Sequence, residues 1–468
     1  MSESSEKAGK AWVLALASVA SCMVALDALV VTTALSTIRR DLDTSIETLE
    51  WTVNAYNLTF AVLLLTGTAI GDRFGRRRMF VCGLGLFTGA SAACALATSA
   101  GWLIAGRAVQ GAGAALVVPL AMALLSAAFP RQQRGRALGI FSGVTGMALI
   151  AGPIAGGAIA QGIAWQWIFW INLPIAAIVM PLAVRRVDES FGPNIALDFA
   201  GLALVTFSAL GLVWGLMRGN AAGWNSLEVG GALGAGTLLA AAFVAWELRA
   251  SAPMVPMRFF QSRAFASGIA ASFLFYASMY GVLFFLPQFL QTAQGNGPLA
   301  AGLRLLPWTS TLFVFAPLGG TLVNRIGERP LVVIGLAVQA LGMVWIGLVA
   351  APDLAYAALV VPLVLAGAGV SIAMPAAQNA VMNSVSASEV GKASGIFNMS
   401  RYLGGVFGIA LLVAAFAQAG SFGSARAFSA GFALSIGVAA GLSFAGAIAG
   451  LALPGREVAR AAPSKAKA

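Results

Sequence analysis

Long apolar stretches dominate this sequence and limit what it can fold into. Segments of about 20 apolar residues, the length that crosses a bilayer as a helix, recur from Trp12 to Leu453 with only short polar loops between them. Charged residues make up 10% of the chain, whereas an average soluble domain contains about 25%. The sequence therefore predicts an all-α polytopic membrane protein and excludes a water-soluble fold.

The apolar stretches divide into fourteen predicted transmembrane helices. Their ranges are 11–34, 50–70, 79–98, 101–124, 136–160, 166–184, 198–218, 228–248, 265–290, 301–322, 331–350, 354–376, 395–418 and 428–453. The first stretch is longer than the apolar core of a signal peptide, so we expect the protein to retain it as its first helix.

Lysine and arginine are unevenly distributed among the loops, which indicates the orientation. With the N-terminus inside, 21 of the 28 basic residues fall on cytoplasmic segments, as the positive-inside rule requires. The others are Arg39, Arg40, Arg218 and Arg426 in outside loops and Arg107, Arg304 and Arg401 within spans. We therefore expect both termini in the cytoplasm. The net charge of +11 then reflects contact with membrane lipids and not with nucleic acid.

An internal repeat suggests how the helices are grouped. The loop GDRFGRRR after the second span has a weaker copy, GTLVNRIGER, after the tenth, in which Asn324 stands where the first copy has Asp72. The spacing predicts an N-terminal six-helix half (1–186), two inserted helices with their linkers (187–262) and a C-terminal six-helix half with a short basic cytoplasmic tail (263–468). Duplication of this kind is typical of transporters. Chance similarity between short basic loops is the alternative.

The first loop copy, DRFGRRR, combines an acidic residue, a glycine and several arginines. Gly75 permits a tight turn, and Asp72 can interact with a helix N-terminus and with an arginine of the other half. The arginines, including Arg73 and Arg76, can face anionic headgroups. Charges that only fix topology would explain the arginines equally well.

An arginine lies inside the fourth predicted span, in GRAVQGAGAALVVP. Placing Arg107 in the membrane costs about 2.5 kcal/mol or more, so it should face a cavity or a partner. Because Arg107 lies near the external end of the span, its side chain could instead reach the interface.

Small residues and a proline mark the fifth span. Gly152 and Pro153 are followed by Gly156 and Gly157. Small residues at four-residue spacing allow two helices to approach closely, and proline kinks a helix.

The first span contains LDALVVTTAL, in which Asp27 is the only carboxylate that we expect deep within a span. A buried carboxylate can bind and release a proton as its surroundings alternate. The chain has no histidine, so a histidine relay is impossible. Asp27 is the leading candidate for proton coupling, with Arg107 as an influence on it; a structural, hydrogen-bonded aspartate is the alternative.

Taken together, these motifs resemble those of the fourteen-span drug:proton antiporters of the major facilitator superfamily over nearly the whole chain. DRFGRRR is similar to the family's cytoplasmic-gate signature, and the GPxxGG segment to its antiporter signature, although Ala148 replaces one glycine. LDALVVTTAL is similar to the family's LDxTxVNVAL. The family usually has glycine where this chain has Thr68, and arginine where it has Gln166.

The resemblance implies a major facilitator fold of two six-helix halves plus two inserted central helices. It also implies proton-coupled export of small lipophilic drugs or antibiotics, cations among them, by alternating access. Gating would involve Asp72, Arg73, Gly75 and Arg76. A uniporter or symporter for a metabolite or organic anion, with Arg107 as the anion anchor, is the alternative.

Polar and aromatic groups within spans are the candidates for substrate binding, because uncharged polar groups in hydrocarbon should face protein or a cavity. They are Asn54, Tyr56, Asn57, Gln110, Tyr280, Gln288, Gln291, Gln378, Asn379 and Asn398. Each could equally be a contact between helices.

Enzymatic chemistry is not expected. Without histidine, neither a Ser/His/Asp triad nor an HExxH metal site can form, and the sequence has no P-loop. The three cysteines lack metal-ligand spacing,. We therefore predict no catalytic residue, no metal and no cofactor, with the proton gradient as the energy source. The expected form is a monomer in a bacterial inner membrane, with protons, lipids and a small-molecule substrate as its partners.

Overall fold

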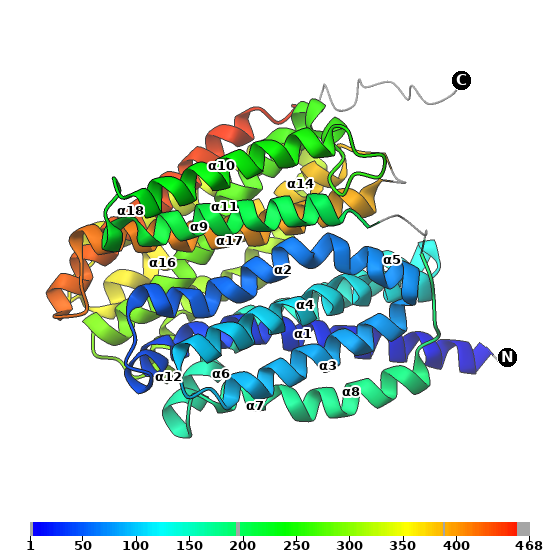
Figure 1. The fold of residues 1–468 in the computed structure, drawn as a ribbon, viewed down its shortest axis with the longest axis horizontal. Helices are drawn as coiled ribbons and strands as arrows, with labels where there is room; N and C mark the ends of the chain where they lie inside the picture. Colours follow the sequence, from blue (N-terminus) through cyan, green and yellow to red (C-terminus); the bar gives the residue numbers. More distant parts are fainter. Residues whose placement is uncertain (1–2, 193–196, 387–388, 456–468) are drawn as a thin grey trace. The chain divides into compact units, whose positions relative to one another are not determined.

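The computed structural model describes residues 3–192, 197–386 and 389–455, and this part of the chain is helical without β-strands (Figure 1). It contains 14 helical segments that are long and apolar enough to cross a membrane. The predicted number of spans and the all-α membrane class are therefore confirmed. Most of the predicted basic tail, 456–468, lies outside the described residues.

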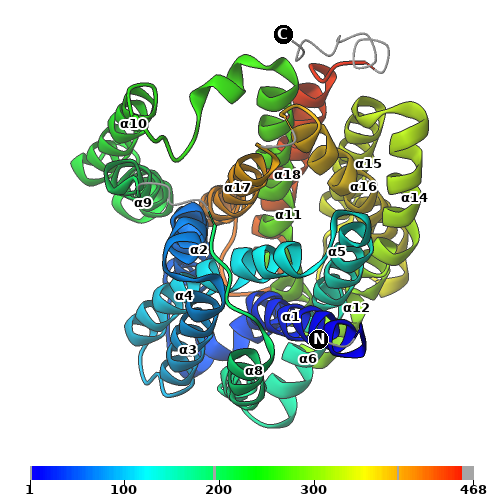
Figure 2. The ribbon, with the colours of Figure 1, turned by 90° about the vertical axis from the view of Figure 1, so that its right-hand side faces the viewer.

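The chain forms two compact units, and the first comprises residues 1–254 and 290–303. Its helices are α1 (Glu3–Asp41), α2 (Ile46–Phe74), α3 (Arg76–Ala95), α4 (Ala100–Ala128), α5 (Arg131–Gly146), α6 (Ala148–Gly162), α7 (Trp167–Trp170), α8 (Asn172–Arg186), α9 (Phe199–Ala222) and α10 (Leu227–Glu247). Within this unit α9 runs beside α2 in both views (Figures 1 and 2), and the rings of Trp51 and Trp214 lie 6.1 Å apart.

The second unit comprises residues 255–289 and 304–468. Its helices are η1 (Met257–Gln261), α11 (Arg263–Gln288), α13 (Leu306–Thr309), α14 (Thr311–Ile326), α15 (Glu328–Val349), α16 (Tyr356–Met382), α17 (Val390–Ala419) and α18 (Ala425–Leu451). The π-helical turn η2 (Phe289–Ala293) and the short helix α12 (Pro298–Arg304) cross the boundaries between the units.

Serine side chains cap several helices. Ser45, Ser99 and Ser226 each accept a hydrogen bond from the backbone N–H three residues later, at the starts of α2, α4 and α10. Such a cap satisfies one of the N–H groups that a helix N-terminus leaves without a partner. The caps fix where these helices begin.

Three predicted spans are interrupted. The fifth is divided at Met147 between α5 and α6, the sixth at Ile171 between α7 and α8, and the tenth among α12, α13 and α14. Pro307 follows the break at Leu305, and proline cannot donate a backbone hydrogen bond within a helix. Apolar length alone does not reveal such breaks, because both parts of an interrupted span remain apolar.

Close helix contacts bring α2 and α4 together. A Cβ atom on Gly111 of α4 would lie 2.4 Å from the carbonyl oxygen of Tyr56 on α2. Only glycine permits this approach, which places Tyr56 beside the polar residues of α4.

Candidate functional site

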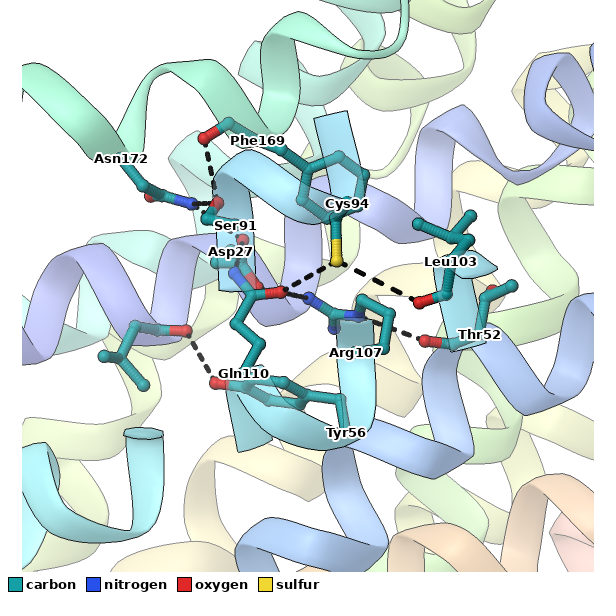
Figure 3. Close-up of polar contacts among 11 residues, drawn as sticks. Asp27, Thr52, Tyr56, Ser91, Cys94, Leu103, Arg107, Gln110, Phe169 and Asn172 are labelled. Carbon is teal, nitrogen blue, oxygen red and sulfur yellow. Dashed lines mark hydrogen bonds and ion pairs between the residues drawn. The ribbon is translucent and has the colours of Figure 1, made fainter. Parts of the chain in front are cut away.

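A buried ion pair joins the first and fourth helices. Asp27 on α1 and Arg107 on α4 are each 1% exposed, and Asp27 Oδ2 lies 2.5 Å from Arg107 Nη1 (Figure 3). The structure thus brings together the two residues that the sequence singled out for proton coupling. Arg107 contacts this partner inside the bundle and does not reach outward to an interface.

Amide side chains complete the surroundings of the carboxylate. Gln110 Nε2 and Asn172 Nδ2 both donate to Asp27 Oδ1, each at 2.9 Å. Asn172 Nδ2 also lies 2.9 Å from Ser91 Oγ, which in turn donates to the Phe169 carbonyl oxygen (Figure 3). The network therefore links α1, α3, α4, α7 and α8.

The guanidinium of Arg107 has further partners besides Asp27. Its Nε donates to the Thr52 carbonyl oxygen at 3.1 Å, and its Nη1 donates to Gln110 Oε1 at 2.8 Å. Its Cζ lies 4.2 Å from the centre of the Tyr56 ring, and the Tyr56 hydroxyl donates to the Val24 carbonyl oxygen at 3.3 Å. Arg107 is thus fixed to α2 as well as to α1.

The hydrogen bonds around Asp27 are those of an ionised carboxylate. Three donors point at its two oxygens, and an ionised carboxylate only accepts hydrogen bonds. The three donors occupy three of the roughly four lone-pair positions of a carboxylate, which leaves one position on Oδ2, beside Arg107, for a proton. Protonation of Asp27 would therefore remove the negative charge that attracts Arg107.

Sequence reasoning missed several uncharged members of this network. Ser91, Asn172 and the Thr52 carbonyl contribute contacts, and Cys94 Sγ lies 3.8 Å from Gln110 Oε1. Polar residues in apolar spans are the only signal that the sequence offers for them. That signal is weak, because it does not say which way a side chain points.

A second buried carboxylate, Glu50, lies near the start of α2. Glu50 is 0% exposed and lies within α2, which begins at Ile46, earlier than predicted. Its Oε1 accepts a hydrogen bond of 2.9 Å from Asn54 Nδ2. Its Oε2 has no hydrogen-bond partner among the described residues. Glu50 is the first residue of the predicted second span, so it lies at the edge of an apolar stretch in the sequence.

The glycines of the GPxxGG segment lie at helix contacts within the first unit. A Cβ atom on Gly152 would lie 2.7 Å from Leu29 Cβ, and one on Gly156 would lie 2.3 Å from the Val30 carbonyl oxygen, both on α1. A Cβ atom on Gly157 would lie 2.3 Å from the Pro298 carbonyl oxygen. Pro153 lies between these contacts, on α6. Thus α6 packs directly against the helix that carries Asp27.

The residues of the DRFGRRR loop form a second cluster in the first unit. Asp72 Oδ1 accepts from Arg76 Nε at 2.7 Å, and Gly75 has a φ of 106°, a region that favours glycine. Arg73 is exposed. The structure thus pairs two of the four predicted gate residues with each other.

Glu189 is a member of this second cluster that the sequence analysis missed. Its two carboxylate oxygens accept from the backbone N–H groups of Arg77, at 2.8 Å, and Arg78, at 3.1 Å. It therefore caps the N-terminus of α3, a favourable position for a negative charge. Nothing in the local sequence indicates that the segment after α8 folds back onto this loop.

The predicted substrate residues do not form one cluster. Tyr56 and Gln110 belong to the Asp27 network, and Gln291 Nε2 donates to the Thr33 carbonyl oxygen on α1. Gln288 and Asn398 donate to carbonyl oxygens four residues earlier in their own helices. Asn54 and Asn57 are buried on α2. Gln378 is exposed and Asn379 is partly exposed. Tyr280 is partly exposed and lies beside other tyrosines.

Comparison with known proteins shows the family. The sequence model of the Major Facilitator Superfamily matches residues 17–409. The chain belongs to the major facilitator superfamily. It is 35% identical over 392 residues to the multidrug resistance protein Stp of Mycobacterium tuberculosis, covering 83% of this chain and 73% of Stp. It is 34% identical over 407 residues to the tetracenomycin C resistance and export protein of Streptomyces glaucescens, covering 86% of this chain and 76% of that protein.

The fold is also that of the superfamily. A POT family transporter, solved in complex with a thioalcohol-conjugated peptide, matches with a TM-score of 0.70 at 14% identity, covering 94% of each chain. At this identity the match shows the fold alone. The superfamily and the named relatives are transporters and not enzymes, and the relatives are multidrug and antibiotic resistance proteins.

Proposed function

We propose that this protein is a proton-coupled antiporter that exports small lipophilic drugs or antibiotics, cations among them, across a bacterial cytoplasmic membrane by alternating access. The names of its relatives support export and this substrate class. The observation that carries the coupling mechanism is the buried pair of Asp27 and Arg107. A carboxylate inside an apolar bundle, whose attraction to a neighbouring cation is lost when it takes a proton, is suited to coupling.

Protonation would act on the contacts of α1. A proton on Asp27 removes the charge that holds Arg107, while Arg107 keeps its bond to the Thr52 carbonyl oxygen on α2. Helix α1 can then shift relative to α2 and α4. Because Gly152 and Gly156 of α6 lie against α1, such a shift is passed on to α6. The proton therefore changes helix packing as well as local charge.

We further propose how the gate and the two halves act. Asp72, Arg73, Gly75 and Arg76 act in cytoplasmic gating, and both termini lie in the cytoplasm. The two six-helix halves with an inserted pair rock as a monomer, driven by the proton gradient without a cofactor. An organic-anion uniporter or symporter anchored on Arg107 has less support, because Asp27 already neutralises that cation.

The test is substrate-induced proton movement in inverted membrane vesicles. A respiration-driven pH gradient is established, and lipophilic cations and antibiotics are added to vesicles with the wild type, Asp27→Asn or the control Asp353→Asn. Asp353 is an exposed carboxylate in a turn. We expect some compounds to collapse the gradient in the wild type and the control but not in Asp27→Asn. Full gradient collapse with Asp27→Asn would refute the coupling role.

A further inference from the structure

A second arginine lies within the membrane-spanning part of the protein, in the second unit. Arg401 is in the middle third of α17 (Val390–Ala419) and is partly exposed. A charged residue at this depth costs at least about 2.5 kcal/mol and normally faces the bundle interior or a water-filled cavity. Neither the proposed coupling pair nor the gate uses it.

No carboxylate neutralises Arg401 within the described part of the second unit. The carboxylates described there are Glu328, Asp353 and Glu389, and each lies at a helix end or in a turn. Arg401 forms no ion pair with them, and its buried Nε has no hydrogen-bond partner in this part of the chain. Arg107, by contrast, contacts a carboxylate and two further oxygen acceptors.

Three tyrosines surround the Arg401 side chain instead. Its Cζ lies 4.9 Å from the Tyr276 ring centre and 5.4 Å from that of Tyr402. Tyr280 has its ring centre 6.3 Å from those of Tyr276 and Tyr402. Tyr276 is 1% exposed, whereas Tyr280 and Tyr402 are partly exposed. Arg401 and these three tyrosines form what we call the tyrosine cluster.

Close packing between α11 and α17 holds the tyrosine cluster in place. Cβ atoms on Gly404 and Gly408 would lie 2.5 Å and 2.0 Å from the carbonyl oxygens of Phe273 and Ala277 on α11. A Cβ atom on Gly405 would lie 2.9 Å from the Tyr280 ring. The two helices therefore meet backbone to backbone, and the missing side chain at position 405 leaves room for that ring.

From this geometry we propose that the tyrosine cluster is a substrate subsite for anionic aromatic compounds, with Arg401 binding a carboxylate or phenolate. A planar guanidinium forms strong, charge-assisted hydrogen bonds with such groups, and the partly exposed Tyr280 and Tyr402 can contribute ring contacts to an aromatic compound,. Cation–π contacts with tyrosine offset only part of the cost of the charge, so an anion is the missing partner. The inference rests on the proposed transport function and specifies one substrate class for it.

The experiment measures equilibrium binding to purified protein in detergent, without a proton gradient. The probes are anthracene-2-carboxylate and its uncharged methyl ester, followed by their fluorescence. We expect the acid to bind the wild type more tightly than the ester, and Arg401→Gln to weaken acid binding about tenfold while ester binding stays within about twofold. Because no gradient is used, failure of proton coupling would not alter this result.

Matched variants make the outcome decisive. The control is Arg304→Gln, because Arg304 also lies over a tyrosine, with its Cζ 5.0 Å from the Tyr356 ring centre; it should keep the preference for the acid. Arg401→Lys retains the charge and should keep that preference with weaker affinity, which covers the case in which Arg401→Gln does not fold. Three results would overturn the proposal. They are an equal loss of affinity for acid and ester in Arg401→Gln, loss of the preference for the acid in Arg401→Lys, and no binding of the acid by the wild type.

Discussion

Removing either partner of the Asp27–Arg107 pair should destabilise the first unit strongly. Both side chains are 1% exposed, and the closest atoms are 2.5 Å apart. Loss of one partner leaves the other charge buried and unpaired, which typically costs about 3–5 kcal/mol. In Asp27→Asn the new amide cannot restore the network, because its NH₂ group must face either Arg107 or the amides of Gln110 and Asn172, all of which are donors here.

A double-mutant cycle separates this coupling from general damage to the core. We expect Asp27→Asn and Arg107→Gln each to cost several kcal/mol, and the double variant to cost about 2 kcal/mol less than their sum. The assay is unfolding of the purified protein in mixed micelles, followed by tryptophan fluorescence. Costs that add to within about 0.5 kcal/mol, or single variants as stable as the wild type, would refute the reasoning. Transport by the double variant should remain absent, because it has no carboxylate at position 27 to bind a proton.

Three further variants test other contacts. Gly156→Ala should slow efflux at least about tenfold, because its Cβ would lie 2.3 Å from the Val30 carbonyl oxygen. The control Gly143→Ala has open space around it and should transport at the wild-type rate. Equal efflux rates for the two variants would contradict the packing argument. Glu189→Gln should weaken the cap of α3 by about 0.3–1 kcal/mol and speed tryptic cleavage of the loop before α3; unchanged cleavage would count against this cap. Glu50→Gln should stay within about 1 kcal/mol of wild-type stability, since a buried carboxyl without a cation is expected to be uncharged; a loss as large as that of Asp27→Asn would show that Glu50 carries a charge.

The amino-acid sequence was sufficient to predict the membrane class and the number of spans. Both depend on local apolar length, because every backbone group in lipid must be satisfied within the helix itself. The sequence also indicated Asp27 and Arg107, since a charged residue in an apolar span stands out wherever the span lies. The four motifs likewise indicated the family, which the match over residues 17–409 confirms.

The tertiary structure decided which side chains meet. Asn172, Glu189 and the tyrosine cluster acquire their contacts from helices or loops that are distant in the sequence. In lipid, the outward and inward faces of a helix are similarly apolar, so the hydrophobic pattern does not indicate how a helix is rotated. The burial of Glu50 shows the same limit, because a carboxylate at the edge of an apolar stretch resembles an interfacial residue until the neighbouring helices enclose it. Helix packing, and not apolar length, thus determined the contents of the site.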